Sequence, residues 1–142
     1  MSKFIALSLM VGLVGYYAYD QAQPAAVGEP PESVRQGYSI VYFGTHDCPA
    51  CKHFTRKYMS DVEGRTGRLG IPFIAREIDS LRGLRRSGSF GEFDGLWRAA
   101  SAKAGYGVPS FAFVKDGKVM AVSTGDCDPV VTAAARDKFA SN

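Results

Sequence analysis

The chain has 142 residues, of which 46% are hydrophobic and 22% charged, a composition that suits one globular domain with an apolar core. Its net charge is +3 and its basic residues are spread along the sequence, so nucleic acid is not an expected partner. The three cysteines are too few for a small scaffold held by disulfides, and two of them lie close together. The close pair therefore indicates redox or metal chemistry.

The N-terminal residues 1–19 are predicted to be a signal peptide or a membrane anchor. Residues 4–19, FIALSLMVGLVGYYAY, carry no charge and fall short of the ~20 apolar residues that span a bilayer comfortably. The run lacks a clean small-x-small cleavage site and ends in tyrosines, which favours a retained anchor, with a buried N-terminal helix as a further alternative. Lys3 before the run and Asp20 after it favour an N-terminus inside and the remainder outside.

Residues 20–37, DQAQPAAVGEPPESVRQG, are predicted to be a flexible linker, because they contain three prolines and few large apolar side chains. The globular domain is expected to occupy residues 38–142. It opens with residues 39–44, SIVYFG, a short β-rich apolar run bounded by turn residues, which predicts a buried strand.

A helix is predicted directly after this strand, with Gly64 and Gly67 at its end. Its inward face is expected to hold the residues at helical spacing, namely Cys51, Phe54, Thr55, Tyr58, Met59 and Val62. Residues 71–78, IPFIAREI, predict a second strand.

The second half of the domain begins with a basic, glycine-containing loop. Ser89 and Glu92 have the spacing of a capping box and predict a second helix, which stops at Gly105. Residues 109–115, PSFAFVK, predict a third strand, and the Asp-Gly pair after it is a strong hairpin signal. A fourth strand over residues 118–124 then pairs back against the third.

A last helix is predicted from Asp128 as N-cap, with Pro129 at the first helical position, through Phe139. The element order is therefore β-α-β-α-β-β-α. Its two β-α-β steps predict parallel strands with helices on the sheet faces, and the hairpin adds an antiparallel strand. The expected fold class is α/β, with a central mixed sheet flanked by helices.

The chemically informative motif is Cys48-Pro49-Ala50-Cys51, at the junction of the first strand and the first helix. Pro49 fits the first helical position, which makes Cys48 the N-cap. There the helix dipole and the free backbone N–H groups favour the thiolate, the species that attacks disulfides. Cys51 lies one turn further on the apolar face, where burial keeps it protonated. We therefore predict that Cys48 is an exposed nucleophile and Cys51 a buried resolving thiol.

The neighbours of the motif act in different directions. His46 can help the thiolate, whereas the adjacent Asp47 opposes it. Together with His53 and the two cysteines, His46 also offers four metal ligands, which makes a copper or zinc chaperone an alternative. A structural zinc site usually takes its second ligand pair from a distant segment, and no such pair is visible, so we expect neither a metal nor another cofactor.

Two stretches of the sequence resemble the thioredoxin superfamily. Residues 40–52, IVYFGTHDCPACK, match its strand–loop–CxxC–Lys pattern, and residues 106–118, YGVPSFAFVKDGK, resemble its cis-proline segment and the following hairpin. Gly125 matches a family glycine after the last strand. The resemblance implies a thioredoxin-like fold and a cis Val108–Pro109 bond beside the active site. It also implies that the backbone of Val108 turns outward to pair with a substrate strand.

The sequence departs from the family at two positions. Tyr42 stands where many members have a buried acid, so the acid commonly proposed to shuttle a proton for the resolving cysteine is missing. Asp47 stands where thioredoxins proper have tryptophan. With these differences and its N-terminal segment, the chain resembles a membrane-tethered member of the superfamily from a bacterial envelope more than a cytosolic thioredoxin. This resemblance implies a periplasmic protein, anchored to the inner membrane or exported and soluble.

Cys127 is the odd cysteine, and the sequence places it just before the last helix. We expect a partly buried free thiol at this position. The alternative is an intermolecular or regulatory disulfide, because an exported chain meets oxidising conditions.

Motif and resemblance together predict a thiol–disulfide oxidoreductase that exchanges disulfides with protein substrates on the non-cytoplasmic side of a membrane. An upstream redox protein is an expected partner. Oxidant, reductant and isomerase all fit the motif, because the direction of exchange depends on the reduction potential and on that partner. The alternative from another class is a tethered thioredoxin-like binding module of an envelope or secretion assembly, in which redox chemistry is secondary.

Overall fold

Strand β1 (Tyr38–Thr45) is buried along nearly its whole length and forms the centre of the fold. The computed structural model describes residues 28–142, in which β1 pairs in parallel with β2 (Phe73–Ile78) and antiparallel with β3 (Ser110–Lys115). Strand β4 (Lys118–Thr124) pairs antiparallel with β3 and completes the sheet order β2-β1-β3-β4. The mixed α/β sheet predicted from the sequence is confirmed.

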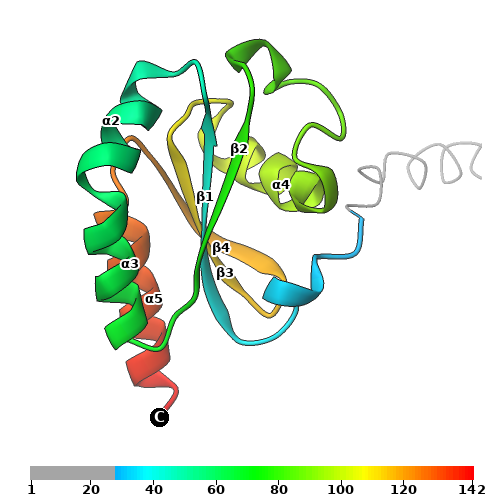
Figure 1. Ribbon diagram of the computed structural model, residues 1–142. Helices are drawn as coiled ribbons and strands as arrows, with labels where there is room; N and C mark the ends of the chain where they lie inside the picture. Colours follow the sequence, from blue (N-terminus) through cyan, green and yellow to red (C-terminus); the bar gives the residue numbers. More distant parts are fainter. Residues whose placement is uncertain (1–27) are drawn as a thin grey trace, which may run out of the picture.

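Helices cover both faces of this sheet (Figure 1). One face carries three of them, namely α2 (Pro49–Lys57), α3 (Met59–Arg68) and α5 (Asp128–Ala140). The other face carries α4 (Asp94–Ala104). Alternation along β1 supplies both layers, because Ile40 and Tyr42 pack on the α2–α3–α5 side, while Val41 and Phe43 pack on the α4 side.

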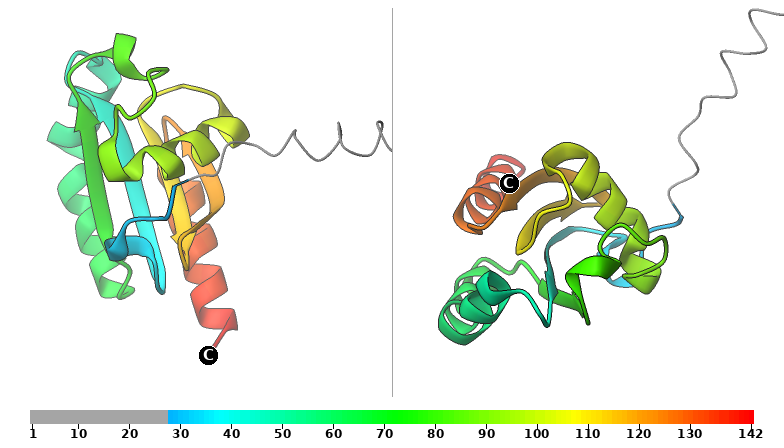
Figure 2. Two further views of the ribbon diagram at one scale, coloured as in Figure 1. Left: turned by 90° about the vertical axis from the view of Figure 1, so that its right-hand side faces the viewer. Right: turned by 90° about the horizontal axis from the view of Figure 1, so that it is seen from above.

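The direction of β3 differs from the sequence prediction of two parallel β-α-β steps. Strand β3 lies beside β1 and runs antiparallel to it, although α4 separates β2 from β3 along the chain. The reason is the orientation of α4, which lies across the strands rather than along them (Figures 1 and 2). The chain therefore re-enters the sheet at the same end of the strands at which β2 leaves it, and the connection from β2 to β3 does not produce a parallel strand.

The helix predicted after β1 is two helices in the structure. Helices α2 and α3 meet at Tyr58, whose φ of −121° departs from helical geometry. The side chain of Tyr58 is exposed, although the sequence predicts that it faces inward. Helix α3 continues through Gly64 and Gly67, which do not end it, because the burial of Val62 against the sheet stabilises the helix around these poor helix formers.

The predicted capping box at Ser89 is absent. The Ser89 hydroxyl donates to the carbonyl oxygens of Gly83 at 2.6 Å and Arg86 at 2.8 Å, and so it closes the loop that precedes α4. Helix α4 begins at Asp94, directly after a short 3-10 helix over Gly91–Phe93. The serine is thus used by the loop and does not cap the helix.

The folded domain begins before Tyr38, inside the segment predicted to be a flexible linker. Residues Glu32–Val34 form a short 3-10 helix, and Val34 is fully buried in the layer on the α4 side of the sheet. The Gly37 N–H donates to Asp116 Oδ1 at 2.8 Å, and the Asp116 N–H donates to the Gly37 carbonyl at 2.9 Å. A single apolar side chain carries this packing, which explains why no periodicity in the sequence indicates it.

Residues 1–27 lie outside the described residues, and with them the predicted anchor or signal peptide over residues 1–19 and the first part of the predicted linker. In the described part of the chain, no helix combines the length and the apolar character needed to cross a membrane.

Candidate redox site

Cys48 lies where β1 gives way to α2, and it is the N-cap of α2, as predicted. Its backbone is extended, with φ −84° and ψ 118°, and Pro49 occupies the first turn of the helix. The backbone N–H of Cys51 donates to Cys48 Sγ at 3.2 Å, and the Lys52 N–H donates to the Cys48 carbonyl at 3.0 Å. The sulfur of Cys48 thus accepts one of the helix N-terminal N–H groups, the role that an N-cap side chain has.

Both cysteines of the motif are buried thiols, and Cys48 is more enclosed than the sequence predicts. Cys48 is 4% exposed and Cys51 is 0% exposed, so the expected exposed position of Cys48 is not observed. The Cys48 thiol lies 3.8 Å from the carbonyl oxygen of Val108, which is within range of a weak S–H···O hydrogen bond. Pro49 and Ala50 are exposed beside it. Cys48 is therefore flanked by two exposed residues of the motif on one side and by Val108 on the other.

The Val108–Pro109 peptide bond is cis and lies beside Cys48, as the resemblance implied. Because β3 pairs antiparallel with β1, the first residues of β3 lie beside the last residues of β1. Pro109 is buried, and its carbonyl oxygen accepts the N–H of Gly125 at 2.8 Å. Gly125 has φ +87°, a conformation that favours glycine, so it closes the loop behind the proline. Two segments distant in sequence thus form one site.

Burial, followed by the hydrogen bond with Cys48, raises the pKa of Cys51 to about 11. Cys51 is therefore a thiol at neutral pH. Tyr42, at the position of the missing acid, is fully buried, and its hydroxyl donates to Glu77 Oε1 at 2.9 Å. Burial also raises the pKa of Tyr42 far above its ordinary value.

Glu77 is a site residue that the sequence analysis did not identify. It lies on β2, directly opposite Gly44 of β1 in the parallel register. Its second oxygen, Oε2, lies 3.6 Å from His46 Nδ1, and the His46 side chain is 61% exposed. Glu77 could be identified only from the register in which β1 and β2 pair, and a sequence motif does not contain that register.

Asp47 is turned toward the segment after β2. Its Oδ1 accepts the Thr45 hydroxyl at 2.8 Å and the Leu81 backbone N–H at 2.9 Å. The hydrogen bond from Thr45 has the largest effect on the pKa of Asp47, and with that from Leu81 it outweighs desolvation and lowers the pKa. Asp47 is thus a carboxylate that holds the loop carrying Cys48 against the next loop.

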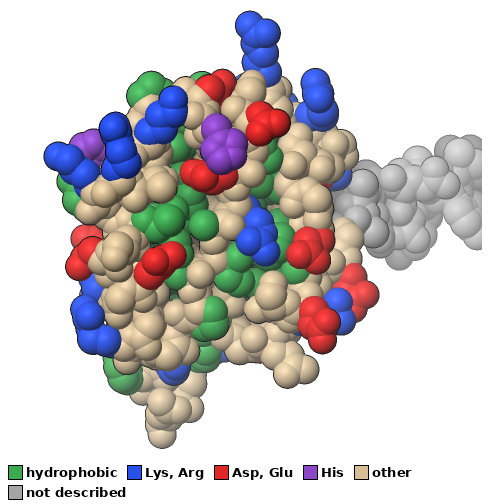
Figure 3. Space-filling model, viewed as in Figure 1, with side chains coloured by type: hydrophobic (Ala, Val, Ile, Leu, Met, Phe, Trp, Pro, Cys, Tyr) green, Lys and Arg blue, Asp and Glu red, His purple; other side chains and the backbone are tan. Residues whose placement is uncertain are grey.

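The surface beside the cysteines is basic on its helical side. The exposed side chains of α2 include Lys52, Arg56 and Lys57. Figure 3 shows Lys and Arg side chains gathered at the corner of the molecule where α2 lies. The surface next to Cys48 is therefore positively charged on this side.

The two histidines of the metal-chaperone alternative do not form a ligand cluster with the cysteine pair in the described residues. Across residues 28–142, the grouping of three potential ligand atoms within 4.8 Å of one another is Asp126, Cys127 and Asp128, three consecutive residues. The ring of His53 packs edge-on against Tyr58, with 5.6 Å between the ring centroids.

Cys127 is a buried free thiol, 7% exposed, close to the sequence expectation. It is the N-cap residue of α5, a position that the sequence assigns to Asp128. Asp128 instead forms an ion pair with Arg65 of α3, with 2.8 Å between Arg65 Nη1 and Asp128 Oδ1. Burial, followed by the charge of Asp128, raises the pKa of Cys127 to about 11.

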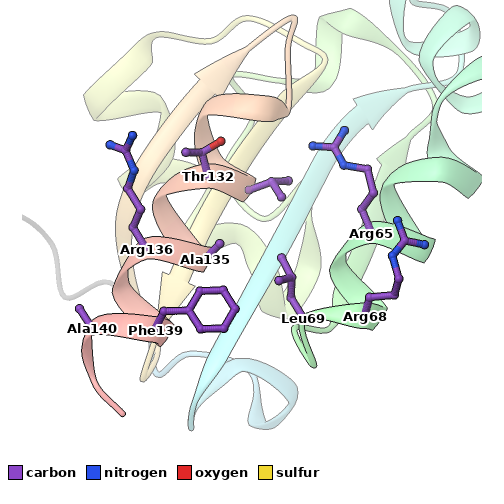
Figure 4. A pocket seen from close by; sticks show the side chains of 9 residues that line it. Arg65, Arg68, Leu69, Thr132, Ala135, Arg136, Phe139 and Ala140 are labelled. Atoms are coloured by element: carbon purple, nitrogen blue, oxygen red, sulfur yellow. The ribbon is translucent and has the colours of Figure 1, made fainter.

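A groove of about 730 Å³ opens between α3 and α5, lined on one side by Arg65 and Arg68 and on the other by Arg136 (Figure 4). Phe139, which is 67% exposed, lies between these two sides. The groove is near the C-terminal ends of both helices, and no residue of the Cys48–Cys51 motif lines it. It is therefore separate from the redox site.

No known family profile matches the sequence, and no curated protein is similar to it. Several solved structures are similar in shape at low identity. A Malassezia sympodialis thioredoxin is 16% identical with a TM-score of 0.47, over 75% of this chain and 82% of that one. Spinach chloroplast thioredoxin f is 20% identical with a TM-score of 0.46, over 74% and 81%. A structure concerning thiol resolution in a yeast mitochondrial 1-Cys peroxiredoxin is 12% identical with a TM-score of 0.46, over 73% and 81%.

The fold class of the protein follows from its own architecture, without these comparisons. The sheet order β2-β1-β3-β4, the helices on both faces, and the CxxC motif at the N-terminus of α2 beside a cis-proline define a thioredoxin-like fold with a dithiol site. The protein is thus a thioredoxin-fold protein. A dithiol so placed supports thiol–disulfide chemistry in general.

Proposed function

We propose that the protein is a thiol–disulfide oxidoreductase that exchanges disulfides with protein substrates through Cys48 and Cys51. The observation that carries the proposal is the position of Cys48 Sγ, 3.2 Å from the Cys51 N–H at the start of α2 and 3.8 Å from the Val108 carbonyl. Cys48 thiolate attacks a substrate disulfide and forms a mixed disulfide, with release of the first substrate thiolate. Cys51 then attacks Cys48 Sγ, closes the Cys48–Cys51 disulfide, and releases the second substrate thiolate.

Reduction of insulin by the dithiol protein tests this function. We expect the wild type to reduce insulin, Cys48→Ser to be inactive, and Cys51→Ser to accumulate a mixed disulfide at Cys48. Cys127→Ser is the matched control and retains activity, because Cys127 lies in the α5 layer and not in the motif. Unchanged activity of Cys48→Ser would overturn the proposal.

The second candidate is a thioredoxin-like binding module in which redox chemistry is secondary. The observation that favours it is the enclosure of Cys48, which is only 4% exposed. A wild type that is folded and fully reduced, and that nevertheless fails to reduce insulin, would favour this candidate over the oxidoreductase.

We also propose that the domain acts on the non-cytoplasmic side of a bacterial inner membrane, where an upstream redox protein resets its cysteine pair. The support is the uncharged run over residues 4–19, which follows Lys3 and precedes Asp20. An alkaline phosphatase fused after Asn142 should be active with the full chain and inactive when residues 1–19 are deleted. Equal activity of the two fusions would contradict export.

A further inference from the structure

Cys51 must lose a proton before it can resolve the mixed disulfide, and its surroundings limit where that proton can go. Cys51 is 0% exposed, so bulk water does not reach its sulfur. The hydroxyl of Thr55, one turn along α2, donates to the Cys51 carbonyl at 3.0 Å. Asp47 is committed to Thr45 and Leu81. Tyr42 lies against α2, with its ring centroid 5.0 Å from that of Phe54, on the side of the sheet where Cys51 is buried. Burial and Cys48 raise the pKa of Cys51, and a hydrogen bond from the Tyr42 side chain lowers it.

Tyr42 reaches Cys51 because Gly44 leaves space for its hydroxyl. Both residues lie on the same face of β1, two positions apart. A Cβ atom on Gly44 would lie 2.1 Å from Tyr42 Oη, so any side chain there would displace the hydroxyl. The ring of Tyr42 therefore runs along the strand toward the end of β1, where the loop with Cys48 begins.

Glu77 continues the path from Tyr42 toward the surface. Its Oε1 accepts the Tyr42 hydroxyl at 2.9 Å, and its side chain is 25% exposed. Its Oε2 faces His46 Nδ1 at 3.6 Å, and His46 is 61% exposed. The carboxylate thus contacts a buried hydroxyl with one oxygen and a solvent-exposed imidazole with the other.

We propose that Tyr42 and Glu77 form a proton relay that deprotonates Cys51 during resolution of the mixed disulfide. This inference rests on the proposed function. As Cys51 Sγ attacks Cys48 Sγ, its proton passes to Tyr42 Oη, and the Tyr42 proton passes to Glu77 Oε1. The S–S bond between Cys48 and Cys51 forms, the bond between Cys48 and the substrate sulfur breaks, and the electron pair leaves as substrate thiolate. The proton on Glu77 leaves through His46 and solvent.

Strand β1, which leads to the CxxC motif, has no buried acid. In this arrangement Glu77 of β2 takes that role and acts through the hydroxyl of Tyr42. Tyr42 acts on a reacting atom, the Cys51 sulfur, and Glu77 acts through Tyr42. The relay predicts that the two residues affect the second half of the exchange and leave the first half, the attack by Cys48, unchanged.

The reaction of the reduced protein with 5,5′-dithiobis(2-nitrobenzoic acid) separates the two halves, because each half releases one thionitrobenzoate. The background is the full chain with Cys127→Ser, which removes the third thiol. We expect Tyr42→Phe and Glu77→Gln to slow the second release about 10²-fold, the lower range for a positioned acid–base group. Glu77→Asp should restore much of the rate, which a merely structural role of Glu77 would not predict. Glu63→Gln, an exposed acid on α3, is the control and should match the parent.

The outcomes separate the relay from the function on which it rests. Second-release rates in Tyr42→Phe and Glu77→Gln equal to that of the parent would overturn the relay. Equal slowing of both releases would overturn it too, because a general distortion of the site would be the cause. A parent protein that shows a normal second release but does not reduce insulin would contradict the proposed function and leave the relay chemistry standing.

Discussion

Tyr42 and Gly44 illustrate how one residue determines what another can do. The tyrosine hydroxyl fills the space that a side chain at position 44 would need, and it donates from there to Glu77 at 2.9 Å. The hydroxyl is buried with a partner, which is the condition for a buried polar group to be tolerated. A larger residue at position 44 should therefore lower the stability of the fold and also disturb the site.

We predict that Gly44→Ala lowers the free energy of unfolding by about 1–3 kcal/mol, the usual cost of overpacking a well-filled interior. Urea denaturation followed by circular dichroism measures the change. Gly64→Ala in α3 is the control, because a Cβ there would meet only Arg68 Nη1 at 3.7 Å. Alanine is also the better helix former, so the control should be neutral or stabilising. Equal effects of the two variants would contradict the prediction.

Cys127 should make stability depend on pH in the alkaline range. Burial raises its pKa to about 11 in the folded protein, above the value of 9.0 for a free cysteine. Folding thus favours the thiol, so this stabilisation is present below about pH 9 and is lost as the pH rises through 11.

The free energy of unfolding, measured from pH 8 to 11, should accordingly fall more steeply for the wild type than for Cys127→Ala. The stability difference between the two proteins should shrink as the pH rises. A difference that stays constant over this range would show that the Cys127 thiol titrates alike in the folded and unfolded chains.

Part of the site could be predicted from local residue chemistry alone. Proline after Cys48 predicts an N-cap, and the structure has Cys48 at that cap. The burial of Cys48 and the role of Glu77 could not be predicted, because each depends on a segment distant in sequence. Val108 covers Cys48 through the start of β3, and Glu77 reaches Tyr42 through the register of β2 with β1.

At the scale of elements, the helices show where sequence patterns stop being informative. Periodicity predicts a single helix after β1 but does not indicate the break at Tyr58, because helical spacing continues on both sides of it. Likewise, the pattern of α4 predicts a helix and an apolar face, but not that the helix crosses the strands. Crossing direction is a property of packing, and Trp97 is central to that packing.

Trp97 should hold α4 to the loop that precedes it. Its side chain is 1% exposed, and Nε1 donates to the Leu84 carbonyl at 2.8 Å. Trp97→Phe removes the donor and leaves that carbonyl unpaired, which should cost about 1–3 kcal/mol of unfolding free energy. Urea denaturation measures the loss, with the exposed Tyr58→Phe as the control. A Trp97→Phe protein as stable as the control would mean that water replaces the hydrogen bond without cost.

At the scale of the whole molecule, element order and fold class could be predicted from the sequence, because each strand carries its own apolar signal. The start of the domain could not. The 3-10 helix over Glu32–Val34 has one inward side chain. The residues after it are attached to the β3–β4 turn by the Gly37 N–H, which donates to the Asp116 carboxylate, and by the Gly37 carbonyl, which accepts the Asp116 N–H. Pro30 also lies against this turn, since a Cβ on Gly117 would come within 2.6 Å of Pro30 Cγ.

The segment before β1 should therefore contribute to global stability. Val34 is 0% exposed and packs in the same layer as Trp97 and Leu96 of α4. Val34→Ala removes buried methyl groups at about 0.8 kcal/mol each and leaves a cavity, so we expect a loss of about 2 kcal/mol in the free energy of unfolding. The exposed Glu32→Ala is the control and should change stability by less than about 0.5 kcal/mol. Cooperative urea unfolding of the full chain measures both variants. If Val34→Ala were as stable as Glu32→Ala, this segment would be a linker after all and the domain would begin at Tyr38.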